Sequence, residues 1–200
     1  MGLMSLDALA YRAIAAIITI TVHEFIKALI SSSLGDPLPK RDKRVTLNPL
    51  SHLEPIGFII MVALGFGWGK PVDTASIYYK DRRNGTLMTY IIPSAANLIL
   101  GVIFALVMTL SKASGSLWVF LYTAALYNMR HALFNIIPVY PLDGAKVLSV
   151  IRDPNKVISM VNNQMFYQLA LILFIVWGIV GRIIDPICGG IIGSIAMLYR

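Results

Sequence analysis

The stretch Leu9–Leu34, LAYRAIAAIITITVHEFIKALISSSL, decides how this chain folds. It is apolar over the length that a helix needs to cross about 30 Å of hydrocarbon, yet it carries His23, Glu24 and Lys27 in its second half. Ionisable side chains within such a segment are costly and by default mark a site that faces the protein interior. The stretch therefore predicts a membrane-spanning helix with a buried polar site. The alternative is a polar contact between helices that carries no chemistry.

The composition supports a membrane protein. The chain has 200 residues, of which 57% are hydrophobic and only 14% are charged, more apolar than a soluble domain of this size can bury. We expect an all-α polytopic membrane protein of about four transmembrane helices. The apolar stretches predicted to span are Leu9–Leu34, Leu87–Leu110, Leu117–Val139 and Phe166–Ile184.

Two further apolar stretches are too short to be upright spans. Ile56–Gly67 is expected to be re-entrant, and Pro186–Tyr199 is expected to complete a C-terminal apolar hairpin. Gly189 and Gly193, at small-x-x-x-small spacing, would let that last segment pack closely on a neighbour. The lone Cys188 is interpreted as a packed small residue.

We expect one membrane-embedded domain over residues 1–200, with a core at 9–148 and C-terminal helices at 166–199, because no loop is long enough for a soluble domain. A cleavable signal peptide is not expected, since the first apolar run lacks a basic region before it and carries charged residues.

The basic residues predict the orientation. They gather in three segments: Lys40, Arg41, Lys43 and Arg44; Lys70, Lys80, Arg82 and Arg83; and Lys146, Arg152 and Lys156. Only Lys112 lies between the second and third spans. Because short cytoplasmic loops are rich in lysine and arginine, these three segments are expected in the cytoplasm and the N-terminus outside. Topology accounts for most of the net charge of +7, so no nucleic acid partner is expected.

His23 and Glu24 begin a recognisable pattern. In a helical His-Glu-x-x-His sequence, residues i and i+4 share a face, so two imidazoles bind one zinc ion and the glutamate beside them acts as general base. Here the position of the second histidine holds Lys27.

A second polar set follows the stretch Leu117–Val139. It carries Arg130, His131 and Asn135 and runs into Pro138-Val139-Tyr140-Pro141-Leu142-Asp143-Gly144. The two prolines must end or unwind the helix, and unwound backbone at membrane depth is tolerated only where protein covers it or a cavity faces it. Asp143 is therefore expected at an internal site, although Leu-Asp-Gly could equally be a helix N-cap at the boundary of the membrane.

Taken together, these residues resemble the site-2 protease family of intramembrane zinc metalloproteases, in particular its bacterial sporulation-factor branch. The matching elements, in the family's order, are His23-Glu24, Asn48-Pro49-Leu50-Ser51-His52-Leu53-Glu54-Pro55-Ile56-Gly57, Gly67-Trp68-Gly69-Lys70-Pro71-Val72, Phe134-Asn135-Ile136-Ile137-Pro138 and Leu142-Asp143-Gly144.

The resemblance implies cleavage of peptide bonds within the transmembrane helix of a membrane-anchored substrate at one buried zinc ion. It assigns His23 and Asp143 as zinc ligands and Glu24 as the base that takes a proton from the zinc-bound water. Asn135 and Asn97 would support the substrate or the site, and His52 would tether the re-entrant segment. The expected location is a bacterial cell membrane.

The sequence departs from the family's pattern at two places. Pro93-Ser94-Ala95-Ala96-Asn97 lacks the family's glycine-proline pair in register, and Lys27 replaces the second zinc histidine. A lysine ligates zinc only after losing a proton, so zinc binding should be weakened or lost. The ammonium could instead supply positive charge beside Glu24 and Asp143.

Three accounts of Lys27 stay open. The chain could be a pseudoprotease that acts as a membrane adaptor and holds transmembrane helices without cutting them. It could be an altered form of an active enzyme. His131 could replace the missing ligand, but the helical rise of about 1.5 Å per residue predicts that it lies well away from Asp143. A small transporter would also explain buried charges, although the duplicated interrupted segments of an inverted repeat are lacking.

Overall fold

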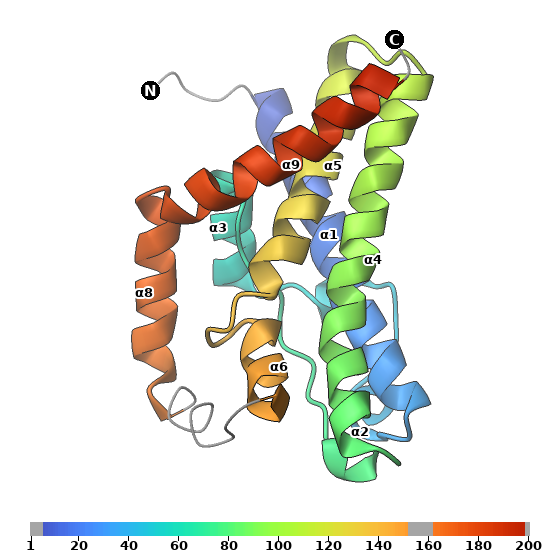
Figure 1. Ribbon diagram of the computed structural model, residues 1–200, viewed down its shortest axis with the longest axis vertical. Coiled ribbons are helices and arrows are strands. Elements are labelled where there is room, and N and C mark those ends of the chain that lie inside the picture. Colours follow the sequence, from blue (N-terminus) through green and yellow to red (C-terminus); the bar gives the residue numbers. More distant parts are fainter. Residues whose placement is uncertain (1–5, 152–161, 199–200) are drawn as a thin grey trace.

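The computed structural model describes residues 6–151 and 162–198, and within these ranges the chain forms helices and connecting segments without a strand. The all-α prediction is confirmed. The elements are α1 (Leu6–Ser33), α2 (Leu38–Arg41), the 3-10 turn η1 (Pro49–Ser51), α3 (Pro55–Leu64), the 3-10 turn η2 (Ser76–Tyr78), α4 (Arg82–Leu110), α5 (Gly115–Asn135), α6 (Asp143–Ile151), α8 (Gln164–Val176) and α9 (Ile179–Leu198), as drawn in Figure 1. Of the predicted basic residues, Arg152 and Lys156 lie outside the described ranges, as does Tyr199.

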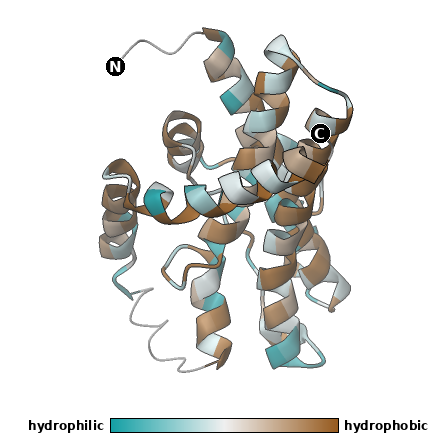
Figure 2. Ribbon diagram, turned by 45° about the horizontal axis from the view of Figure 1, so that its top comes forward, coloured by the Kyte–Doolittle hydropathy of each residue, from teal (hydrophilic) through white to brown (hydrophobic). Residues whose placement is uncertain are grey.

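Three of the described helices are long and apolar enough to cross a membrane: α1, α4 and α9. The shorter α3 and α8 are also apolar. Figure 2 shows hydrophobic residues along much of the helices, and on α4 the side chains of Ile99 and Ile103 are exposed. Apolar side chains on the outside of long apolar helices are expected of a membrane protein.

The centre of the molecule is a bundle of α1, α4 and α5, which lie against one another (Figure 1). Small residues allow this close packing: Ala15 and Ala16 of α1 and Ala124 and Ala125 of α5 are fully buried. Gly101 of α4 lies so close to α5 that a Cβ atom would meet the side chain of Met129 at 2.7 Å. α5 is 21 residues long, and its second half carries the polar residues that make it an interior helix rather than a lipid-facing one.

The segment Ile56–Gly67 runs out and returns, as predicted for a re-entrant segment. Glu54 begins α3 by accepting hydrogen bonds from the backbone amides of Ile56 (3.2 Å) and Gly57 (2.6 Å). Gly65 ends the helix at φ 81°, a left-handed conformation that glycine adopts without steric cost. The chain then returns in extended form against Gly57 and Met61, and the amide of Lys70 donates to the carbonyl of His52 (2.7 Å).

The C-terminal helices begin and end at other residues than predicted. The stretch Phe166–Ile184 is not one helix, because α8 ends at Val176 and Gly178 takes φ 71° before α9 begins. Pro186 does not start a new segment but lies inside α9. Gly189 and Gly193 have no neighbour within 4 Å of an added Cβ among the described residues, so the predicted close packing is not made with that part of the chain.

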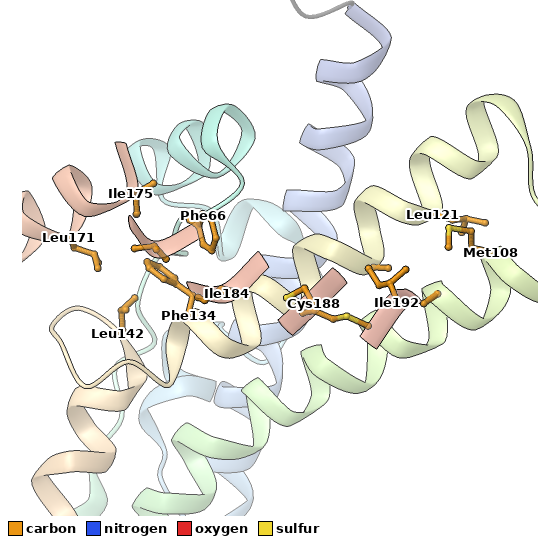
Figure 3. Packing of buried hydrophobic residues seen from close by; sticks show 14 residues of the cluster. Phe66, Met108, Leu121, Phe134, Leu142, Leu171, Ile175, Ile184, Cys188 and Ile192 are labelled. Atoms are coloured by element: carbon orange, nitrogen blue, oxygen red, sulfur yellow. The ribbon is translucent and has the colours of Figure 1, made fainter. Parts of the chain in front are cut away.

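The main apolar core joins α9 to the bundle and to the turn after α3. Figure 3 shows Ile184, Cys188 and Ile192 of α9 packed among residues of α4, α5 and this turn. Cys188 is a fully buried free thiol, as its interpretation as a packed small residue predicted. Phe66 and Phe134 lie 5.7 Å apart between ring centroids, so the same core holds the returning segment against the end of α5.

Figure 1 also shows that α2, the start of α4 and α6 lie at one end of the molecule, whereas the start of α1 and the turn between α4 and α5 lie at the other. Most of the described basic residues of the three predicted segments lie in or next to α2, the start of α4 and α6, and so at the same end. This arrangement agrees with the common side that the charge pattern predicted for them.

Candidate functional site

The polar residues of α1 lie on its buried face. His23 is fully buried, and Glu24 and Lys27 are 5% and 4% exposed. Glu24 and Lys27 are one turn apart on α1, because a helix brings residues i and i+3 to the same face. Burial of three polar residues within five positions requires partners from elsewhere in the chain.

Those partners come from the start of α6. α5 ends at Asn135, the chain from Ile136 to Leu142 is not helical, and Asp143 is the first residue of α6. The two predicted helix-breaking prolines lie in this connection. Gly144 fits directly against the backbone carbonyl of Ile136, where a Cβ atom would overlap it. The connection is thus folded back on the end of α5, which brings the carboxylate of Asp143 inward to α1.

Asp143 is held from two sides. Its Oδ2 lies 2.8 Å from Nε2 of His23, and its Oδ1 lies 2.8 Å from the ammonium of Lys27. The same ammonium donates to Oε1 (3.2 Å) and Oε2 (3.3 Å) of Glu24. The four predicted residues therefore form one buried cluster in which a lysine lies between two carboxylates.

A cavity of about 270 Å³ opens beside this cluster, and Glu24, Lys27 and Asp143 line it. Asn135 also lines it, and its amide donates to the backbone carbonyl of His131 (3.0 Å). The remaining wall is partly aromatic, with Trp68, Tyr90 and Tyr140. The cavity combines charged groups at one side with apolar and aromatic walls, a composition usual in sites that bind a ligand.

One side of the cavity is the extended segment that follows α3. Gly69, Pro71, Val72, Asp73 and Thr74 all line it. Arg44, which is 7% exposed, fixes this segment by donating to the carbonyls of Lys70 (2.6 Å) and Pro71 (2.8 Å). Gly69 must be small, because an added Cβ would lie 2.6 Å from Ile20 of α1 and 3.0 Å from Glu24.

His52 lies at the base of the segment, as expected for a tether. Its Nε2 hydrogen-bonds the carbonyl of Thr46 (2.7 Å), and its own carbonyl accepts from the amide of Lys70. Burial lowers the pKa of His52, and the nearby Arg44 lowers it further. A neutral ring with a proton on Nε2 fits this position, because it donates to Thr46.

Asn97 does not line the cavity. Its amide donates to the carbonyl of Thr19 (3.1 Å) and to the side chain of Asn128 (3.0 Å). Asn97 therefore joins α4 to α1 and α5 behind the site. In this position it supports the bundle and does not contact a molecule in the cavity.

His131 contacts the cluster through His23, because α5 packs against α1. Its ring meets the ring of His23 edge to face, with 4.7 Å between centroids. The distance from His131 to Asp143 that the helical rise implies stays a prediction.

The donor set does not fit a zinc ion. His23 and Asp143 are suitable ligands, but the third position holds the ammonium of Lys27, which has no lone pair and is already paired with Asp143. His131 does not complete the set: among residues 6–151 and 162–198, no group of three His, Cys, Asp or Glu side chains is placed to hold a metal ion.

Sequence reasoning missed Arg44, Asn128 and Tyr90. Arg44 was assigned only to a cytoplasmic basic segment, and no sequence pattern signals that it binds two carbonyls of a distant segment. Asn128 lies in an apolar run five residues after Thr123. Its polarity within that run was the only signal that could have identified it. Tyr90, whose ring is 5.7 Å from Nζ of Lys27, had no signal in the sequence.

Comparison with known proteins adds one similarity. No family model matches the chain, and no solved structure matches it. The chain is 29% identical over 186 residues to a protein of Bacillus subtilis (strain 168) named "Putative zinc metalloprotease YwhC", and the match covers 85% of this chain and 82% of that protein. This similarity is consistent with a protease family and supports a metalloprotease function in general.

Proposed function

We propose that this chain is a multi-pass membrane protein with the scaffold of a site-2-type intramembrane protease, and that it receives a transmembrane segment of a membrane-anchored protein in the cavity beside Glu24 and Asp143. The proposed location is a bacterial cell membrane, with the basic segments in the cytoplasm. The form with Lys27 is proposed to bind this segment without hydrolysing it.

The observation that carries the proposal is the cavity that opens beside the buried charged cluster, between the apolar helices and the segments 68–74 and 140–146. A closed ion-pair cluster would be enough to hold α1 and α6 together, but it would not require an adjacent space of about 270 Å³. A peptide that has unfolded locally brings backbone amides and carbonyls that need partners within the membrane. Asn135 and the extended wall of the cavity offer such partners.

The extended segment gives the cavity one preformed wall. Arg44 binds the carbonyls of Lys70 and Pro71 on one side of the segment, and residues 71–74 line the cavity on the other. A backbone already held in extended form can bind an extended peptide without a further ordering cost. The segment is thus suited to align an unwound chain alongside Glu24.

Hydrolysis is the second candidate. The similarity to a protein named as a zinc metalloprotease favours it, and so does the cluster of His23, Glu24 and Asp143, of which Glu24 and Asp143 line the cavity. The ammonium between the two carboxylates argues against it in this chain, because it occupies the only oxygen of Asp143 that His23 leaves free. Binding without hydrolysis needs no metal ion. It therefore agrees both with the similarity to a protease and with the ammonium between the carboxylates.

A photo-crosslinking experiment tests binding. A photoreactive amino acid is placed at Asp73 or at Lys146, which are exposed residues of the cavity wall, and at Ile103 of α4 as a control. The full chain in lipid vesicles is mixed with a synthetic transmembrane peptide that has a Pro-Gly interruption, or with an uninterrupted leucine-rich helix. We expect crosslinks to the interrupted peptide at residues 73 and 146 and few at 103.

The result that overturns the proposal is equal crosslinking of both peptides at all three positions, because contact would then report only random collision in the membrane. Mass spectrometry of the same samples separates the two candidate functions. An intact interrupted peptide supports binding without cleavage, and two fragments in amounts exceeding the protein support the hydrolase.

A further inference from the structure

We infer that the ammonium of Lys27 is a built-in cation that takes the structural place of a metal ion, so that the buried site of this chain assembles and stays closed without one. The inference rests on the proposed function only for the identity of the site. It adds that the fold itself is independent of metal and that a single residue decides this.

The contacts of Lys27 are those of a coordinating centre. Its ammonium reaches Oδ1 of Asp143 and both carboxylate oxygens of Glu24, at 2.8 to 3.3 Å. The face of Tyr90 lies on another side, with its ring centroid 5.7 Å away, in the range of a cation–π interaction. One cation thus holds two residues of different helices, α1 and α6, as a shared metal ion would.

The charges of the cluster require a cation at this position. Glu24 and Asp143 are 5% exposed each, and two buried carboxylates this close repel each other strongly. With Lys27, the side chains of Glu24, Lys27 and Asp143 carry one net negative charge. A neutral residue in place of Lys27 would leave two negative charges on the carboxylates. Removal of the ammonium is therefore expected to open the site, unless another cation enters.

The same arrangement excludes zinc. A metal ion at this position would have to displace the ammonium from Asp143, and Lys27 would have to lose its proton before it could become a ligand. The rest of the donor set remains in place, since Nε2 of His23 already points to Oδ2 of Asp143 at 2.8 Å. Replacement of Lys27 by histidine should therefore remove the internal cation and complete a set of three ligands in one step.

The experiment compares the full-length chain, purified in detergent, with Lys27→His, Lys27→Met and Lys40→His. Methionine keeps the unbranched shape of the lysine stem without the ammonium and its charge. Lys40 lies exposed in α2, so Lys40→His controls for zinc that binds to any added histidine. Zinc content is measured by elemental analysis after incubation with zinc and desalting, and the melting temperature is measured with and without EDTA.

We expect less than 0.1 zinc per chain in the wild type and in Lys40→His, with melting temperatures that EDTA does not change. Lys27→His is expected to hold about one zinc and to melt at a lower temperature in EDTA. Lys27→Met is expected to melt about 10 °C below the wild type, because it leaves two buried carboxylates without their cation.

Stoichiometric zinc in the wild type overturns the inference, and so does a melting temperature of Lys27→Met equal to that of the wild type. If Lys27→Met does not fold, the double variant Lys27→Met/Asp143→Asn, which also removes one carboxylate charge, should regain folded protein; a double variant that stays unfolded counts against the inference. None of these results depends on peptide binding, so crosslinking from Asp73 continues to test the proposed function separately.

Discussion

Nε2 of His23 lies 2.8 Å from Oδ2 of Asp143, although 120 residues separate them in the sequence. The other carboxylate oxygen of Asp143 is bound by Lys27, also at 2.8 Å. Asp143 is therefore the residue through which α6 is attached to the buried face of α1. α6 also packs against α4, and this carboxylate fixes the start of α6, with one wall of the cavity, against α1.

Asp143→Asn should be strongly destabilising. Asparagine keeps the shape of the side chain but leaves Lys27 with only Glu24 as a counter-ion, and loss of one partner of a buried ion pair costs about 3–5 kcal/mol. The free energy of unfolding in detergent measures the effect. The matched control is Asp7→Asn at an exposed position of α1, which should change stability by less than about 0.5 kcal/mol. Equal stability of the two variants would contradict the role given to Asp143.

Gly144→Ala should displace α6 and open the site. The added methyl group would overlap the carbonyl of Ile136, and backbone atoms cannot move aside as a flexible side chain can. Gly189→Ala in α9 is the control, because the structure places nothing within 4 Å of its added Cβ. We expect a lower melting temperature and loss of crosslinking from Asp73 for Gly144→Ala, and neither change for Gly189→Ala. Normal crosslinking in Gly144→Ala would show that the contact does not position the site.

Asn97→Leu should destabilise the bundle by about 1–3 kcal/mol, because it removes two buried hydrogen bonds and leaves the carbonyl of Thr19 and the side chain of Asn128 without their donor. The control is Thr123→Ala, at a half-buried position of α5 where the hydroxyl donates only to the carbonyl of Val119 in its own helix. Unfolding in detergent measures both. Since Asn97 lies behind the cavity, folded Asn97→Leu protein should still crosslink to the interrupted peptide. Loss of crosslinking in stably folded protein would instead place Asn97 in the binding site.

Stability should fall below about pH 6.5 through His52. Burial lowers the pKa of His52 in the folded state below the value of about 6.5 in the unfolded chain, so the unfolded chain binds the proton more readily. The stabilising contribution is present above pH 6.5 and decreases as the pH falls, by at most about 1.4 kcal/mol per pH unit, until the folded pKa is reached. Unfolding free energies at pH 7.5 and 5.5 test this, with His52→Gln as the variant that should lose that part of the pH dependence.

The sequence predicted much of the fold because hydrophobic length and charge have direct structural consequences here. The helical class follows from the apolar composition, and the segment that turns back near Gly65 follows from the shortness of that apolar stretch. The internal site at His23, Glu24 and Asp143 follows from the cost of placing such residues in an apolar span without partners. The division of the last span could not be predicted, because the run holds both Gly178 and Gly181 and nothing in the sequence indicates that Gly178 alone takes a left-handed conformation.

Long-range contacts were also beyond the sequence. Arg44 has the same local context as Lys40 and Arg41, yet only Arg44 is buried against the carbonyls of Lys70 and Pro71. The contact of His131 with His23 was not predicted for a similar reason, since it depends on how α5 packs against α1. Tertiary packing selects these partners, and one sequence does not reveal it.

The central claim is that this chain binds a membrane segment at a site that Lys27 keeps free of metal and without hydrolytic activity. The most direct test incubates wild type and Lys27→His, each with one equivalent of zinc, with the interrupted transmembrane peptide in lipid vesicles and follows cleavage by mass spectrometry. The account predicts an intact peptide that crosslinks to the wild type, and fragments with Lys27→His. Repeated cleavage of the peptide by the wild type would contradict it.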